Sequence, residues 1–315
     1  MANEVKIIFG AANFEQFSED TRREILAVLE NNNVKEIDTA YLYGSSEQTL
    51  AVAGAPTKFT ISTKSPGFLP GVLTNSSVIA AADKSLDNLG VAQVDTYFLH
   101  SPDSETPLEE TLSAVQELYE ARKFVRFGLS NFTPKQVQEV YDMMSSKGYV
   151  LPSVFQGNYN AVARGYESEL FPLLRKLGIK FYAYSPIAGG FLVKSAEAIK
   201  AGIQGGRWDK DTPTGQMYLR LYGKPKLLEA LYDWDAIAEE AMVTKAALAY
   251  RWVTFCSCLD GKYGDAVIIG ATKVEQLQES LKTLKDGPLP SSIVAKINKI
   301  WDTIKAEAPV DNYHG

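Results

Sequence analysis

Three short apolar runs of the sequence each end on an ionisable residue, namely Asp38, Lys64 and His100, and Tyr43 follows Asp38 by five positions. A free tyrosine has a pKa near ~10, too high to exchange protons readily at neutral pH. An ammonium group within about 4–6 Å lowers that pKa because it favours the phenolate. We therefore predict that Lys64 lowers the pKa of Tyr43, while Asp38 keeps Lys64 charged and oriented.

His100 adds a hydrogen-bond donor to this set. An imidazole can donate to a carbonyl oxygen, where negative charge builds up as a hydride arrives at the carbon. With Tyr43 as the proton donor, the set suits general-acid catalysis of carbonyl reduction. Tyr41 is an alternative proton donor, because spacing alone does not decide which phenol faces the lysine. A second interpretation makes Lys64 a Schiff-base nucleophile, as in lyases of the aldolase kind.

These side chains need strands and helices that bring them together. Eight short apolar runs alternate with longer amphipathic stretches, and they cover Val5–Phe9, Val34–Asp38, Phe59–Lys64, Val94–His100, Val125–Ser130, Val154–Asn158, Lys180–Ser185 and Ala266–Gly270. Runs that are apolar almost throughout are typical of parallel strands covered on both faces. Eight strand–helix units predict a closed (β/α)8 barrel of the TIM type, in which C-terminal strand ends face the active site.

A doubly wound open sheet is the structural alternative to the barrel. Its usual dinucleotide-binding motif, Gly-x-Gly-x-x-Gly after the first strand, is missing, since Gly10 is followed by Ala-Ala-Asn-Phe. Helix signals fall between the runs. Residues 133–136, Thr-Pro-Lys-Gln, combine an N-cap, a proline at the first helical position and a capping-box glutamine. The other boundary signals are Gly148, which closes that stretch, Asn75 and Gly90, which bracket another helix, and Gly178, which ends a third.

The chain of 315 residues is somewhat longer than the roughly 250 of a typical barrel, so we predict one domain over residues 1–315 with an insertion. The regular strand spacing breaks between Lys180 and Ala266, where a Gly-rich polar piece covers residues 189–223. We predict that this piece is a long loop over the C-terminal face, where ligand lids sit, and that extra helices follow toward the C-terminus.

Composition narrows the class of protein. A net charge of −6 and a pI near 5.2 argue against a nucleic-acid partner, and no apolar stretch approaches the ~20 residues of a membrane span. No secretory signal is visible at the N-terminus. Cys256 and Cys258, with two histidines in the chain, cannot form a usual zinc site. We interpret both as buried core thiols in a reducing compartment, which predicts a cytoplasmic protein without a metal and leaves monomer and homodimer open.

Residues 37–47, Ile-Asp-Thr-Ala-Tyr-Leu-Tyr-Gly-Ser-Ser-Glu, resemble the signature of the aldo-keto reductases, in which this aspartate and the tyrosine before the glycine are catalytic. Lys64 and His100 match the two remaining positions of the family's catalytic tetrad. Further similar blocks cover residues 128–132, 156–160, 183–190 and 269–277, in order along nearly the whole chain. Segments 217–218 and 264–268 are similar to the aflatoxin-aldehyde and succinic-semialdehyde reductase group.

The resemblance implies NADPH or NADP+ as cofactor. It places Ser130, Asn131 and Gln156 at the nicotinamide carboxamide and Tyr184 against the ring. Glycine-rich backbone at 188–192 would approach the pyrophosphate, with Arg207 as a clamp, and Thr272 and Lys273 at a helix start (274–284) would hold the 2′-phosphate. The complete set of implied cofactor positions is Gly10, Asp38, Ser130, Asn131, Gln156, Tyr184, Ser185, Pro186, Ala188, Gly190, Leu192, Arg207, Gly270, Thr272, Lys273, Gln276, Glu279 and Ser280.

The implied substrate is a small aldehyde or ketone. Loop positions suggest that it meets, besides His100, the side chains of Phe9, Phe14, Phe68, Tyr218 and Arg220. Three features depart from the family pattern: Ser280 replaces the usual asparagine of the adenine contact, Arg220 is offset from its expected place, and too few residues precede the first strand for the β-hairpin that often closes the barrel bottom. A third interpretation is a regulatory subunit that binds the nucleotide with little turnover, but such a subunit would have no need of the tetrad.

Overall fold

The computed structural model describes residues 4–314 and contains a closed barrel of eight parallel strands in chain order. The strands are β1 (Lys6–Gly10), β2 (Glu36–Asp38), β3 (Thr60–Lys64), β4 (Val94–Leu99), β5 (Phe124–Ser130), β6 (Pro152–Asn158), β7 (Lys180–Tyr184) and β8 (Ala266–Ile269). Strand β1 pairs in parallel with both β2 and β8, which closes the barrel. The predicted (β/α)8 barrel is therefore confirmed, and each predicted apolar run overlaps one strand.

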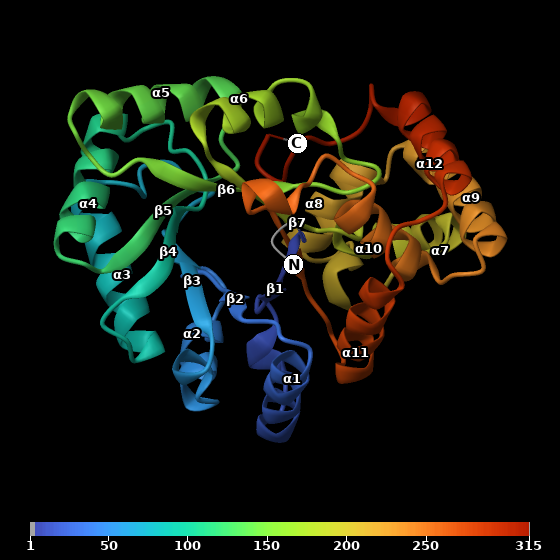
Figure 1. Cartoon of the computed structure of the whole chain (residues 1–315), viewed down its shortest axis with the longest axis horizontal. Coiled ribbons are helices and arrows are strands. Elements are labelled where there is room, and N and C mark those ends of the chain that lie inside the picture. The colour runs from blue at the N-terminus through green and yellow to red at the C-terminus, as the bar shows by residue number, and fades with distance from the viewer. Residues whose placement is uncertain (1–3, 315) are drawn as a thin grey trace.

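Twelve α-helices surround this barrel within residues 4–314. They are α1 (Glu19–Asn31), α2 (Ser46–Val52), α3 (Asn75–Leu89), α4 (Leu108–Glu120), α5 (Pro134–Ser146), α6 (Leu170–Leu177), α7 (Ala196–Ala201), α8 (Pro213–Tyr222), α9 (Pro225–Glu240), α10 (Lys245–Phe255), α11 (Val274–Thr283) and α12 (Ser291–Ile304). The late helices α9 and α12 pack side by side at one edge of the molecule (Figure 1). None of these helices is both long and apolar enough to cross a membrane.

Helix boundaries follow the local signals of the sequence. Thr133 accepts a hydrogen bond from the amide of Gln136, and the Gln136 side chain accepts one from the amide of Thr133, so the predicted capping box is present. Gly90 and Gly178 close α3 and α6 in the left-handed conformation. The helix α3 begins at Asn75 as predicted, and its N-cap is Thr74, whose hydroxyl accepts from the amide of Ser77.

Side chains of the strands alternate between the barrel interior and the layer under the helices. The interior is filled by Ile8, Phe98, Val154, Tyr182, Ala266 and Ile268, and the larger apolar cluster lies between strands and helices. Since Ile8 points inward, its neighbour Phe9 points to the helix layer, where it is buried.

The segment 189–223 is not the loop that its glycines suggested. It contains α7, the short 3-10 helix η5 (Gly206–Trp208) and α8. Tyr218 and Tyr222 lie on one face of α8 because they are four residues apart, and both are buried, with Tyr218 beside the ring of Trp208. The aromatic residues therefore order a segment whose composition predicted an irregular lid.

The two cysteines are free thiols, but the prediction that both are buried is wrong. Cys256 is half-buried and Cys258 is exposed, because they follow the end of α10 in a surface turn.

The N-terminal end of the barrel is closed by charged side chains. Arg126 on β5 bonds to Asp95 on β4 and donates to the hydroxyl of Tyr182 on β7 at 3.0 Å. Lys6 on β1 pairs with Glu36 on β2 at 2.5 Å. Both ion pairs join residues in the N-terminal halves of neighbouring strands.

Candidate active site

The four predicted catalytic residues come together at the C-terminal end of the barrel. Asp38 and Lys64 are the last residues of β2 and β3, His100 directly follows β4, and Tyr43 lies in the loop between β2 and α2. The Lys64 Nζ lies 5.1 Å from the centre of the Tyr43 ring, and the Tyr43 and His100 rings are 5.7 Å apart, edge to face. Tyr41, the alternative proton donor, is 39% exposed and has no such contact with His100.

Lys64 and Asp38 form a buried ion pair at 2.6 Å. The lysine side chain is completely buried, and it also donates to the carbonyl of Thr39 at 2.7 Å. The second oxygen of Asp38 accepts a hydrogen bond of 2.8 Å from the side-chain amide of Gln156 on β6. Burying a charge is costly unless it is paired and hydrogen-bonded, and here both charges are.

The Tyr43 hydroxyl forms no hydrogen bond within residues 4–314 and is therefore free to donate to a bound molecule. Burial raises the pKa of this phenol, and the positive charges of Lys64 and Arg207 oppose that shift without overcoming it. The prediction of a lowered Tyr43 pKa is thus wrong for the structure as it stands. The physical reason is that desolvation disfavours the phenolate more than the nearby ammonium stabilises it.

His100 is a neutral imidazole. Burial lowers its pKa well below the usual value, and the charge of Lys64 lowers it further. Neither ring nitrogen has a protein partner among the described residues, and of the two only Nδ1 is buried. A neutral ring with its proton on Nε2 can therefore donate to a molecule in the site. The Phe68 ring covers the imidazole edge to face at 4.9 Å.

A hydrogen-bond network joins the ends of β4, β5 and β7. Asn131 donates to the carbonyl of His100 at 2.8 Å and to the Ser130 hydroxyl at 3.1 Å, and it accepts from the Tyr184 hydroxyl at 2.7 Å. Asn131 has the left-handed φ of 61°, which asparagine tolerates better than most residues. Ser130, Asn131 and Tyr184 are therefore brought together, as predicted, and Gln156 lies beside Ser130 as its partner in the register of β5 and β6.

The predicted pyrophosphate segment is the 3-10 turn η4 (Ala188–Val193), directly after Tyr184-Ser185-Pro186. Its backbone is left-handed at Ala188, Gly189 and Gly190. A Cβ on Gly189 would lie 2.0 Å from the ring of Tyr218, so the turn packs closely on α8. The side chain of Leu192 is buried in the core, so only its backbone is available to a ligand.

The start of α11 presents the predicted phosphate site. Its N-cap, Lys273, is extended, exposed and without an ion-pair partner in residues 4–314. Gln276 accepts from the amide and the hydroxyl of Thr272 at 3.1 and 2.9 Å. Ser280 donates to the carbonyl of Gln276 at 2.8 Å, while Glu279 is exposed. Gly270 precedes this segment. A Cβ atom built on Gly270 would lie 3.8 Å from the carbonyl oxygen of Gly10.

Two predicted substrate residues do not reach the site. Phe9 and Phe14 are buried against each other, with ring centres 6.3 Å apart, in the layer between β1 and α1. The prediction for both is wrong: Phe9 is on the face of β1 that points to the helix layer, and Phe14 in η1 packs into that layer too. Phe68 does lie at the site, and the Tyr218 hydroxyl lies close enough to raise the pKa of Tyr43. Arg220 is exposed on α8, and no described contact joins it to the tetrad.

The C-terminal tail is a part of the site that sequence reasoning missed. Asp311 is buried and accepts from the Tyr166 hydroxyl at 3.0 Å and from the amides of Tyr313 and His314. The amide of Asn312 donates to the Tyr184 hydroxyl at 3.3 Å. The Tyr313 ring then lies 6.1 Å from the ring of Phe68. No local motif marks these residues, because their contacts join them to Tyr166, Tyr184 and Phe68 far away along the chain.

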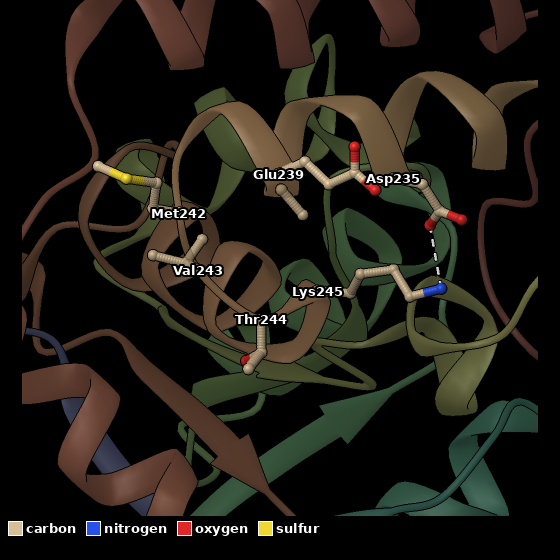
Figure 2. A pocket seen from close by; sticks show the side chains of 7 residues that line it. Asp235, Glu239, Met242, Val243, Thr244 and Lys245 are labelled. Atoms are coloured by element: carbon tan, nitrogen blue, oxygen red, sulfur yellow. Dashed lines mark ion pairs between the residues drawn. The ribbon is translucent and has the colours of Figure 1, made fainter.

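A surface depression elsewhere does not share this chemistry. It lies at the turn between α9 and α10 and is lined by Asp235, Ala238, Glu239, Met242, Val243, Thr244 and Lys245 (Figure 2). Its ion pair joins Asp235 and Lys245 at 3.0 Å. None of its residues belongs to the strand ends that carry the tetrad.

Comparison with known proteins gives an independent assignment. The family model described as "Aldo/keto reductase family" matches residues 6–302. The chain is 40% identical to "Oxidoreductase sirO" of Leptosphaeria maculans over 317 positions, covering 96% of this chain and 95% of that protein. It is 38% identical to "Aflatoxin B1 aldehyde reductase member 2" of Homo sapiens over 309 positions, covering 90% and 82%. "Aldo-keto reductase family 7 member A3" of Homo sapiens is 38% identical over 293 positions, covering 87% and 86%.

Proposed function

Since this chain belongs to the aldo/keto reductase family, we propose that it reduces aldehydes or ketones to alcohols with NADPH, and that Tyr43 donates the proton. The observation that carries the proposal is the convergence of four side chains at one end of the barrel. There a buried Lys64–Asp38 pair at 2.6 Å lies beneath the Tyr43 ring, and neutral His100 lies at the edge of that ring.

The residues at the strand ends fit a nicotinamide nucleotide. Among the described residues, Gln156 forms a side-chain hydrogen bond through its amide nitrogen alone, so its Oε1 is available to a carboxamide N–H. Ser130 and Asn131 supply further polar groups, and Tyr184 supplies an aromatic face at the end of β7. At the far end, the exposed Lys273 and the start of α11 offer a positive charge and free helix amides to a 2′-phosphate. When bound, NADPH supplies the hydride.

The protein's own groups handle the proton. His100 donates a hydrogen bond from Nε2 to the substrate carbonyl oxygen and so orients it toward Tyr43. Tyr43 gives its hydroxyl proton to that oxygen as negative charge develops. The raised pKa keeps the phenol protonated at neutral pH, and Lys64 stabilises the phenolate left after transfer.

The wall around this position is apolar and aromatic. Phe68 and Leu69 are 39% and 66% exposed in the loop after β3, and Tyr41 and Leu42 are 39% and 45% exposed next to Tyr43. Tyr313 closes the wall from the C-terminal tail. Such a rim favours aromatic or otherwise apolar aldehydes, in keeping with relatives named aflatoxin B1 aldehyde reductases.

The alternatives are weaker for physical reasons. A Schiff-base lysine must be a neutral and reachable amine, whereas Lys64 is fully buried and ion-paired with Asp38. A nucleotide-binding subunit without turnover would not require a free Tyr43 hydroxyl and an unpartnered His100 imidazole around one point.

Replacing Tyr43 by phenylalanine tests the proton donor. We expect kcat for an aromatic aldehyde to fall by roughly 100-fold or more, because general-acid assistance contributes about 10²–10⁴-fold. The Kd for NADP+ should stay within about twofold, since the phenol is not among the groups expected to bind the nucleotide. Loss of nicotinamide absorbance measures the first and fluorescence titration the second. Turnover like that of the wild type in Tyr43→Phe would refute the assignment.

Replacing Lys273 by alanine tests the cofactor preference. Removing one positive charge from a 2′-phosphate site should raise the KM for NADPH by roughly tenfold, on the scale of 1–2 kcal/mol for a charge-assisted contact. The KM for NADH, which lacks that phosphate, should not change. Lys282→Ala, on the last turn of the same helix, is the matched control. An equal rise in both KM values would contradict the phosphate role.

A further inference from the structure

We propose that Glu15 is a positioning residue for Tyr43, an inference that rests on the proposed function. Glu15 belongs to the 3-10 turn η1 (Phe14–Gln16) between β1 and α1, on a different segment from the tetrad. Its carboxylate accepts hydrogen bonds from the amide of Ser45 at 2.5 Å and from the Ser45 hydroxyl at 2.9 Å. Ser45 is two residues after the phenol that must meet the substrate.

The backbone next to the phenol needs such a restraint. Gly44, between Tyr43 and Ser45, has a left-handed φ of 56°, and a Cβ there would lie 2.4 Å from the Glu15 carboxylate. Backbone bonds from the Tyr43 amide to the Ala40 carbonyl at 3.0 Å and from the Ser46 amide to the Tyr43 carbonyl at 2.9 Å set the turn, and glycine at position 44 leaves this link the most conformational freedom. Both Gly44 and Ser45 are exposed, so core packing does not hold them in place. The two bonds from Glu15 restrict the chain at this point.

Glu15 is itself fixed by the protein. Arg22 on α1 donates to the carbonyl of Glu15 at 2.7 Å and to the carbonyl of Phe14 at 3.1 Å. The Phe14 ring is buried against Phe9 and Phe17. The aromatic residue that sequence position suggested for the substrate thus anchors the turn that carries Glu15. A carboxylate on an anchored turn can hold its partner more firmly than one on a free loop.

A second contact joins the segment between β1 and α1 to the start of α2, next to the bonds that Glu15 forms. The Ser46 hydroxyl donates to the carbonyl of Ala11 at 2.8 Å and is 2.9 Å from the Thr39 hydroxyl. That buried contact fixes the start of α2, where the Thr49 amide also donates to the Ser45 carbonyl at 2.9 Å, and the Glu15 bonds hold the amide and the hydroxyl of Ser45 on the side facing the phenol's loop. Glu15 bonds to the amide and the hydroxyl of Ser45 and forms no hydrogen bond to the Tyr43 hydroxyl, so it acts through placement of the phenol.

Three variants separate placement from other effects. Glu15→Ala removes both bonds, and Glu15→Gln keeps an amide oxygen that can accept both. Glu19→Ala removes a carboxylate of the same region that pairs on the surface with Arg23. We expect kcat for an aldehyde to fall roughly 10- to 100-fold in Glu15→Ala, since small misplacements of a reacting group have effects of this size. Glu15→Gln should recover most of that loss, and Glu19→Ala should match the wild type.

Two readouts do not depend on turnover. The Kd for NADP+, measured by fluorescence titration, should be unchanged in all three variants. Carbon-13 NMR of ring-labelled tyrosine, with the Tyr43 signal identified by its loss in Tyr43→Phe, should show that signal displaced in Glu15→Ala and not in Glu19→Ala. If the wild type reduced no carbonyl compound, the reductase proposal would fail, and the NMR signal would still decide whether Glu15 places the phenol.

The proposal is overturned if Glu15→Ala keeps the kcat of the wild type, if its Tyr43 signal does not move, or if Glu15→Gln is as impaired as Glu15→Ala. Melting temperatures identify loss of fold. Should Glu15→Ala be unfolded at the assay temperature, Ser45→Ala takes its place, because it removes one of the two bonds. A smaller fall in kcat, roughly threefold to tenfold, is then expected, and no fall at all would overturn the proposal.

Discussion

At the scale of single residues, the site depends on which side chains carry a charge and which stay neutral. Lys64 stays in the core because Asp38 and the Thr39 carbonyl take its hydrogen bonds at 2.6 and 2.7 Å. Burial, and after it the charge of Lys64, lowers the pKa of His100, so this ring does not add a second positive charge. The result is one fixed cation, one neutral donor and one protonated phenol around the same point, an arrangement suited to carbonyl reduction.

The neutral state of His100 predicts a pH dependence of stability. The unfolded chain takes up a proton on this histidine below about pH 6.5, whereas the folded protein does not. Because the unfolded state then binds more protons, the free energy of unfolding falls as the pH drops below about 6.5. Between pH 7.5 and 5.5 the loss should be on the order of 1 kcal/mol. Urea unfolding of wild type and His100→Gln measures it.

His100→Gln should lose less stability over this pH range than the wild type, because it lacks the titrating ring. His314, the other histidine, is present in both proteins and serves as an internal control. Parallel pH curves for the two proteins would contradict a buried neutral His100.

At the scale of elements, the loops at the C-terminal ends of the strands store backbone strain. Phe68 after β3, Asn131 after β5, and Ser185 and Ala188 after β7 all have φ between 53° and 65°. Left-handed backbone at non-glycine residues costs energy and persists where surrounding contacts impose it. Here the Ser101 hydroxyl accepts from the amide of Phe68 at 2.8 Å, which fixes one of these residues across two loops.

Asp103 joins the same two loops and yields a prediction. Burial would raise its pKa, but hydrogen bonds from the amides of Glu105, Leu73 and Gly71 lower the pKa to about 2. Asp103→Ala removes these bonds, and we expect it to lower the free energy of unfolding by about 2–4 kcal/mol. It should also raise the KM for the aldehyde, because the loop that carries Phe68 loses its attachment. Urea unfolding and steady-state kinetics test both effects.

The carboxylate of Asp103 contributes stability above pH ~4, where the unfolded group is ionised, and loses that contribution as the pH falls toward about 2. Asp302→Ala, whose carboxylate pairs on the surface with Lys305, is the control and should change stability by less than about 1 kcal/mol. If Asp103→Ala were as stable as this control, the proposal that Asp103 joins the two loops would be wrong.

At the scale of the whole molecule, the two ends of the barrel have separate tasks. The C-terminal end carries the tetrad, while the N-terminal end is closed by Lys6, Glu36, Asp95, Arg126 and Tyr182. In barrels of this type, the loops after the strands carry function and the opposite face carries stability. This separation lets the active-site loops vary without loss of the fold.

Replacing Arg126 by alanine tests that separation. Its guanidinium bonds to Asp95 and Tyr182 and has an 18% exposed side chain, so removal leaves a partly buried carboxylate without its cation. We expect the free energy of unfolding to fall by about 2–4 kcal/mol, somewhat less than for a fully buried pair. The kcat should stay within about twofold of the wild type. A tenfold fall in kcat for a folded Arg126→Ala protein would contradict the independence of the two barrel ends.

The sequence by itself determined the barrel and the positions of the tetrad residues along it. Eight apolar runs and their helix caps are local patterns, and parallel strands in chain order must place Asp38, Lys64 and His100 at one end. Local patterns did not decide which side of β1 carries Phe9, how aromatic packing orders segment 189–223, or that burial raises the pKa of Tyr43.

Only the tertiary structure brought in residues far apart along the chain. Glu15 meets Ser45 across 30 positions, and the amide of Asn312 meets Tyr184 across 128. No short pattern encodes such contacts, because they depend on how closed loops pack after the barrel has formed. Desolvation likewise depends on the sum of all neighbours around a group, so it becomes known only when the chain is folded.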